Sequence, residues 1–178
     1  MLRAVAFLLL LLSWPVFSRW THHCNPNARC GCSSKPAIIS RIVGGENADM
    51  NSWGWAVALH YGGEYFCGGS ILSERWILTA AHCLAGLNPG LITVSAGSNR
   101  LSSVNQRRTL DSVIIHAEYD AEMFDNDIGL IKLRSPLNMS DSTIARLCLP
   151  MSTDRFYPPT DTNVSCRTNE LSFIIEQL

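Results

Sequence analysis

Residues 55–79 have the sequence WAVALHYGGEYFCGGSILSERWILT, and this stretch decides the fold class. Its β-branched and aromatic residues fall into three short runs, and the Gly62-Gly63 pair separates the first run from the second. Runs of this length and composition, interrupted by turn residues, favour β-strands joined by tight turns. The stretch therefore predicts consecutive short strands.

The same pattern of short apolar runs separated by turn residues continues downstream of this stretch. The turn signal Leu87-Asn88-Pro89-Gly90 precedes a further apolar run, and residues 80–84 are expected to form a single helical turn. The six predicted strands cover Trp55 to Tyr61, Tyr65 to Ser73, Trp76 to Thr79, Leu91 to Ala96, Thr109 to His116 and Ile128 to Leu133. Six short strands in succession predict an all-β domain, either a small antiparallel barrel or a sandwich.

The composition narrows the class of partner. The 178 residues carry 14 Lys+Arg against 15 Asp+Glu, which gives a formal net charge of -1. This balance gives no electrostatic reason to expect nucleic acid or an anionic membrane surface as a partner. The length suffices for one core of ordinary size.

Residues 1–18 are typical of a secretory signal peptide. Arg3 precedes an apolar run from Ala4 to Leu12, and Val16 and Ser18 are small enough for a cleavage point after Ser18. We therefore expect a secreted, extracellular protein. A signal anchor that stays in the membrane is the alternative, but this run is shorter than the roughly 20 apolar residues that a membrane span needs.

Residues 19–41 are polar and bear cysteines, and Pro26, Gly31 and Pro36 interrupt any helical or strand period. We interpret this segment as a propeptide. Secretion makes the seven cysteines of the chain disulfide candidates, and an odd number leaves one over. The alternative is a metal cluster, because zinc takes imidazole and thiolate ligands. Its ligands would come from His22, His23, Cys24, Cys30 and Cys32.

Three further segments carry the functional signal. They are Thr79-Ala80-Ala81-His82-Cys83, Asp125-Asn126-Asp127-Ile128-Gly129-Leu130, and Arg41 followed by Ile42-Val43-Gly44-Gly45. Along the chain the segment at Arg41 comes first, then the one at His82 and then the one at Asp127, which is the order found in the trypsin-like (chymotrypsin-fold) serine proteases. The chain resembles this family, and the resemblance covers roughly Arg41 to Cys166.

The resemblance implies both a fold and partners. Residues 42–166 would form a six-stranded antiparallel Greek-key barrel, the N-terminal half of the family's two-barrel fold, and residues 167–178 an irregular, divergent tail. An activating trypsin-like protease would cleave between Arg41 and Ile42, and the substrates would be proteins or peptides. The resemblance implies no cofactor and no metal. The chain has no Asp or Glu between the strands around Leu91 and Leu110, where some family members bind calcium.

The resemblance also assigns roles to two residues. His82 would be the general base, which takes a proton from a serine nucleophile and later gives it to the leaving amine. Asp127 would hold the imidazole ring of His82 in the required tautomer and stabilise its protonated form. His60 and His116 are expected to be strand-end residues without a catalytic role.

Further expectations concern the cysteines and the asparagines. The resemblance implies a disulfide between Cys67 and Cys83, and a second between Cys148 and one of Cys24, Cys30 and Cys32. Cys166 would be left unpaired, because its family partner belongs to the second barrel. The patterns Asn138-Met139-Ser140 and Asn163-Val164-Ser165 make Asn138 and Asn163 candidate glycosylation sites.

The nucleophile of this family does not occur in the sequence. All 12 glycines lie at or before Gly129, so no Gly-Asp-Ser-Gly-Gly segment follows Asp127. We expect the chain as given to be inactive, because that segment supplies both the serine and the oxyanion hole. The alternative function is that of a secreted, catalytically dead homologue that binds proteins. The sequence also departs from the family at Gly54, where proline is usual.

Overall fold

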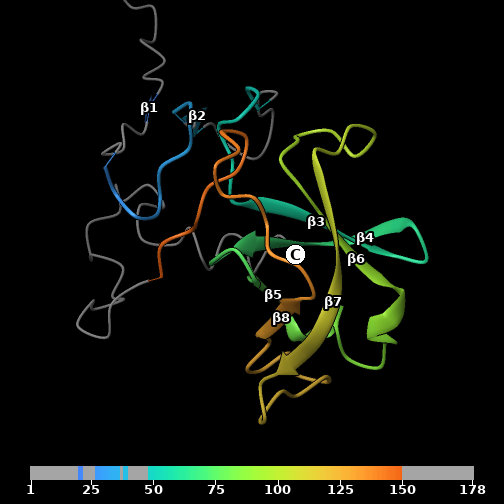
Figure 1. Cartoon of the computed structure of the whole chain (residues 1–178). Helices are drawn as coiled ribbons and strands as arrows, with labels where there is room; N and C mark the ends of the chain where they lie inside the picture. The colour runs from blue at the N-terminus through green and yellow to red at the C-terminus, as the bar shows by residue number, and fades with distance from the viewer. Residues whose placement is uncertain (1–19, 22–26, 37, 40–47, 150–178) are drawn as a thin grey trace, which may run out of the picture.

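A computed structural model describes residues 20–21, 27–36, 38–39 and 48–149 of the protein (Figure 1). Several of the predictions fall outside these ranges and concern residues that are not described further. They are the signal peptide over residues 1–18, the cleavage site at Arg41 and Ile42, Asn163, Cys166 and the tail over residues 167–178.

Six antiparallel strands form a closed barrel. They are β3 (Ala56–Tyr61), β4 (Glu64–Ile71), β5 (Trp76–Thr79), β6 (Ile92–Ala96), β7 (Gln106–Ile115) and β8 (Gly129–Leu133). Their order around the barrel is β3-β4-β5-β8-β7-β6, and β3 closes the barrel by pairing with β6. Because β5 lies beside β8 and not beside β6, the last four strands form a Greek key. The structure confirms the all-β class and selects the barrel over the sandwich.

The remaining elements of the described ranges are short. Two 3-10 turns, η1 (Ala81–Cys83) and η2 (Pro89–Leu91), lie between β5 and β6, and η1 is the helical turn predicted within residues 80–84. Strands β1 (Trp20–Thr21) and β2 (Ile38–Ile39) pair with each other. Because Pro26, Gly31 and Pro36 interrupt any strand period, the sequence predicted no strand in residues 19–41. The pairing of β1 with β2 shows that this prediction was wrong. Over the described ranges, the chain has no helix of the length and apolar character that a membrane span requires.

The barrel core follows from the alternation of side chains along the strands. Val57 and Leu59 on β3 point inward and pack in one buried cluster with Ile131 and Leu133 on β8. The hairpin between β3 and β4 turns at Gly62-Gly63, where both glycines have positive φ, 59° and 97°. Two-residue turns of this kind need positive φ, which glycine adopts without steric cost.

The segment over residues 27–36 is attached to the barrel. In Figure 1 this blue segment lies against the orange segment that follows β8. Cys30 and Cys148 form a disulfide, and the backbone N–H of Gly31 donates to the carbonyl of Arg146 at 2.7 Å. The hydroxyl of Ser34 donates to the carbonyl of Ser142 at 2.7 Å. The upstream segment is thus held both by a covalent bond and by hydrogen bonds.

Gly54 takes part in the same attachment, which accounts for its departure from the family pattern. Its N–H donates to the hydroxyl of Ser33 at 3.0 Å, and proline has no N–H to make this bond. A Cβ on Gly54 would lie 3.0 Å from the backbone nitrogen of Ala145. The position therefore favours a residue with an N–H and without a side chain.

Replacing Gly97 with alanine is expected to lower the free energy of unfolding by about 3 kcal/mol. Gly97 follows β6 with φ 84°, and a Cβ there would lie 2.6 Å from the hydroxyl of Thr143 and 3.0 Å from the Cβ of Asn105. The substitution combines an unfavourable backbone conformation with a steric clash. Urea unfolding of the two proteins measures the loss.

Gly62→Ala is the matched control for this substitution. Gly62 also has positive φ, but nothing lies within 4 Å of a Cβ at this position. Gly62→Ala should therefore lower the free energy of unfolding by only about 1 kcal/mol, the penalty of the left-handed backbone. Equal losses in the two variants would show that Thr143 and Asn105 move aside without cost.

Candidate active site

The pairing of two strands brings the two predicted catalytic residues together. β5 and β8 are antiparallel neighbours, and Thr79 at the end of β5 is opposite Gly129 at the start of β8. His82 follows Thr79 by one short turn, in η1, and Asp127 lies two residues before the start of β8 at Gly129. Residues 45 positions apart in the sequence thus meet at one end of the barrel.

Asp127 binds His82 through both of its carboxylate oxygens. Oδ2 lies 2.6 Å from Nδ1 of the imidazole, and Oδ1 accepts a hydrogen bond of 2.8 Å from the backbone N–H of His82. The side chain of Asp127 is 13% exposed and that of His82 is 30% exposed. The carboxylate is therefore shielded, while the ring remains open to solvent.

This arrangement assigns the tautomer of His82. An ionised carboxylate is only an acceptor, so the ring proton of neutral His82 belongs on Nδ1, and Nε2 keeps its lone pair. Nε2 is then the basic nitrogen of the ring. The second bond, to the backbone N–H, fixes the orientation of the carboxylate itself, so the position of the ring does not depend on one contact.

The disulfide between Cys67 and Cys83 supports the ring from the side of β4. The Sγ atom of Cys83 lies 3.4 Å from Nε2 of His82. Cys67, His82 and Cys83 also make up the one cluster of metal-ligand types in the described ranges. Because the two sulfurs are bonded to each other, they are not available as thiolate ligands, and this cluster is not a metal centre.

The loop before Asp127 has an unusual backbone. Phe124 and Asn126 have φ of 55° and 54°, in the left-handed region that residues other than glycine seldom adopt. Hydrogen bonds close the loop at both sides: Nδ2 of Asn126 donates to the carbonyl of Glu118 at 2.9 Å, and the N–H of His116 donates to the carbonyl of Ile128 at 3.1 Å. These bonds fix the loop, so that Asp127 stays within hydrogen-bond distance of His82.

Two residues of this loop were not predicted as part of the site. The ring of Phe124 lies edge-on to the ring of His82, with centroids 6.0 Å apart, and its side chain is 60% exposed. Burial raises the pKa of the Tyr119 phenol above its ordinary value, and the negative charges of Asp127 and Asp120 raise it further. Tyr119 therefore stays neutral near the carboxylate of Asp127. Nothing in the local sequence distinguishes either aromatic residue from a packing residue.

The other predicted residues are distributed around the barrel. Cys148 is bonded to Cys30, and Cys32 is also in a disulfide, so neither Cys30 nor Cys32 is a thiolate ligand of the alternative metal cluster. Asn138 is exposed in the segment after β8, where its Oδ1 accepts from the N–H of Ser140 at 3.2 Å. His116 is exposed, and His60 lies on the outer face of β3.

Comparison with known proteins agrees with this geometry. The Trypsin family model matches residues 42–171. Two similar proteins are Transmembrane protease serine 11G from Mus musculus and from Rattus norvegicus, each 38% identical over 133 residues. The match covers 74% of this chain but only 31% of each relative, so the chain spans about a third of their length. The chain belongs to the trypsin family of serine proteases, and its described barrel is the N-terminal part of that fold.

Proposed function

We propose that this chain carries the general base and the orienting carboxylate of a secreted serine endopeptidase, and that without a serine nucleophile it does not hydrolyse peptides. His82 is the base and Asp127 is the carboxylate. One observation carries the proposal: Asp127 holds both Nδ1 and the backbone N–H of His82, at 2.6 and 2.8 Å. This pair presents Nε2 as a base toward solvent, which the catalytic serine of such an enzyme requires.

Activation by cleavage between Arg41 and Ile42 is part of the same proposal. An activating protease of trypsin-like specificity would cut there, and the Cys30–Cys148 disulfide would then keep the upstream segment attached to the barrel. The expected substrates are proteins or peptides, with no cofactor. Asn138, which is exposed, and Asn163 are proposed to carry glycans.

The chain treated with trypsin, and assayed after the trypsin is blocked, should show no hydrolysis of Arg, Lys or aromatic esters. The reason is that a triad without its serine loses on the order of a million-fold in turnover. The measurement is the rate of ester hydrolysis above the blank, and a sample that was never cleaved is the control.

Hydrolysis that disappears in a His82→Ala variant would contradict this expectation, because it would show that the chain contains a nucleophile. Absence of activity combined with tight, specific capture of a protease inhibitor or a protease substrate would instead favour the catalytically dead binding homologue. The two outcomes separate the enzyme from the binding module.

We propose secretion because the N-terminal sequence has the pattern of a signal peptide. The name of the two relatives suggests a second possible localisation, in the membrane. Both relatives are called transmembrane proteases, which favours an anchored protein whose barrel lies outside the cell. Expression in a cell with a secretory pathway should give soluble protein in the medium, shortened by about the first 18 residues. Full-length chain found only in the membrane fraction would support the anchored form.

A further inference from the structure

Gly129, the first residue of β8, provides space and not a special backbone conformation. Buried residues alternate along β8, so Gly129 lies on the inward face of the strand together with Ile131 and Leu133. Its φ is not in the positive range that favours glycine. A glycine inside a strand weakens the strand, and it often marks a place where another part of the chain approaches closely.

The part of the chain that approaches Gly129 is the side chain of Leu84. A Cβ on Gly129 would lie 2.8 Å from Cδ1 of Leu84, and 3.4 Å from the carbonyl oxygens of Ala80 and Ile114. Two carbon atoms in contact need about 3.5–4.0 Å. Leu84 directly follows η1 and is only 2% exposed. The side chain of Leu84 therefore occupies the space that a side chain at position 129 would need.

Leu84 and Gly129 are both close in sequence to the candidate active site. Leu84 comes two residues after His82, and Gly129 comes two residues after Asp127. The N–H of Leu84 donates to the carbonyl of Ala81 at 2.9 Å, so Leu84 is held in the same turn as His82. The contact between Leu84 and Gly129 therefore joins the turn that carries His82 to the strand that follows Asp127.

We propose that Leu84 and Gly129 are positioning residues for His82 and Asp127. Because position 129 has no side chain, η1 can lie close enough to β8 for Asp127 to reach His82. Both bonds depend on this approach: Oδ2 of Asp127 lies 2.6 Å from Nδ1 of His82, and Oδ1 accepts from the backbone N–H of His82 at 2.8 Å. The inference rests on the roles proposed above for these two residues.

A methyl group at position 129 would displace the turn, because Leu84 has no free space beside it. Leu84 belongs to the core cluster that also contains the fully buried residues Ile77 and Ile131. Protein cores are close-packed, with few voids. To restore an ordinary contact distance, Leu84 has to move by roughly 1 Å, and the turn moves with it. A hydrogen bond of 2.6 Å that lengthens by about 1 Å is no longer a hydrogen bond.

The test is Gly129→Ala in the full chain, measured at the two bonds themselves. The proton signal of Nδ1–H reports the bond from the His82 ring to Asp127, and hydrogen exchange of the His82 backbone N–H reports the second bond. We expect the Nδ1–H signal to be lost through exchange with water, and the backbone N–H to exchange at least about tenfold faster. Neither measurement needs catalysis, so the outcome does not depend on whether the chain is an enzyme or a binding homologue.

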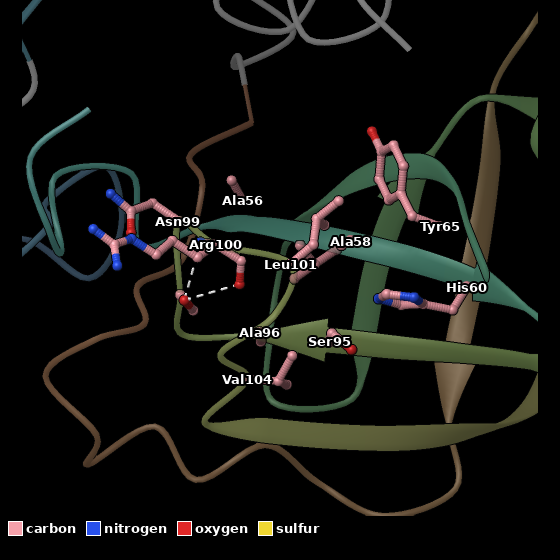
Figure 2. Close-up of a pocket in the computed structure, with 12 residues that line it drawn as sticks. Ala56, Ala58, His60, Tyr65, Ser95, Ala96, Asn99, Arg100, Leu101 and Val104 are labelled. Carbon is pink, nitrogen blue, oxygen red and sulfur yellow. Dashed lines mark hydrogen bonds between the residues drawn. The ribbon is translucent and has the colours of Figure 1, made fainter. Parts of the chain in front are cut away.

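Gly97→Ala is the control for a general loss of stability. This substitution is also expected to destabilise the barrel, but Gly97 follows β6, which pairs with β3 and β7 and not with β5 or β8. Figure 2 shows this end of β6, with Ser95 and Ala96, beside β3. Both His82 signals should be unchanged in Gly97→Ala. The same change in both variants would overturn the proposal, because the signals would then report only the stability of the barrel.

The double variant Leu84→Val/Gly129→Ala tests whether the contact itself positions His82. Valine has one carbon fewer than leucine, and alanine has one more than glycine, so the double variant conserves the volume of the contact, which cores tolerate best. We expect it to recover the Nδ1–H signal and the slow exchange of the His82 N–H. Unchanged His82 signals in Gly129→Ala would overturn the proposal, because Leu84 would then have moved aside.

The double variant also decides the question if Gly129→Ala does not fold. Recovery of the fold together with both His82 signals would support the proposal. A double variant that does not fold, or that folds without these signals, would overturn it, because restoring the volume of the contact would not have restored the position of His82.

Discussion

Replacing both Cys30 and Cys148 with alanine is expected to lower the free energy of unfolding by about 5 kcal/mol. The disulfide joins residues separated by 118 positions, and a bond that closes so long a loop removes much conformational entropy from the unfolded chain. Typical domains are stable by about 5–15 kcal/mol, so the variant should be close to unfolding. Urea unfolding of the chain before cleavage at Arg41 measures the loss.

Cleavage after Arg41 supplies the control for this prediction. In the cleaved protein, the disulfide joins two separate chains and no longer closes a loop, so its removal should destabilise the barrel much less. An equal loss before and after cleavage would contradict the loop argument. It would show that the stabilisation comes from local contacts, such as the bond from Gly31 to Arg146.

The barrel strands could be predicted because their side-chain pattern is local. Each predicted strand from Trp55 to Leu133 overlaps an observed strand, and β5 has the predicted bounds, Trp76–Thr79. β7 is longer than predicted: it starts at Gln106 instead of Thr109. Its first residues are polar, and they are in a strand because they pair with β6, from Ala96 opposite Gln106 to Val94 opposite Arg108. Pairing of this kind is a tertiary effect that composition does not encode.

The upstream strands β1 and β2 illustrate the opposite case. Each has two residues, which is too short for any alternation to appear in the sequence. They form a sheet only because the fold places Trp20 opposite Ile39. The disulfide partner of Cys148 likewise could not be chosen from the sequence, since three upstream cysteines were available and only the fold brings Cys30 to it.

The candidate active site could be predicted from the sequence only in part. His82 and Asp127 were identified from their flanking residues, but the double contact between them depends on the pairing of Thr79 with Gly129. Phe124 reaches His82 through a left-handed backbone, which local propensity disfavours. His60 lies on β3 with its side chain on the outer face, and the residue is nevertheless only 4% exposed. A histidine on the outer face of a strand gives no sign in the sequence that it will be buried.

Replacing His82 with alanine should reduce turnover about a million-fold in a longer form of the protein, one that continues into a Gly-Asp-Ser-Gly-Gly segment. The reason is that the serine then has no base to accept its proton, while the oxyanion hole remains. The measurement is kcat on an arginine ester after activation. A loss below about a hundredfold would contradict the role of His82 as the base.

Asp127→Asn in the same longer form should reduce turnover about 10⁴-fold, through the tautomer of His82 and not through its position. The backbone N–H of His82 needs an acceptor, so the carboxamide oxygen takes the place of Oδ1, at 2.8 Å in the unaltered protein. The amide NH₂ then faces Nδ1 and donates to it, which moves the ring proton to Nε2 and removes the lone pair that the serine requires. The ring should stay in place, so a nitrogen spectrum of the imidazole would show the proton on Nε2 instead of Nδ1. Loss of activity with the proton still on Nδ1 would contradict this account, because the defect would then lie in the charge of Asp127 alone.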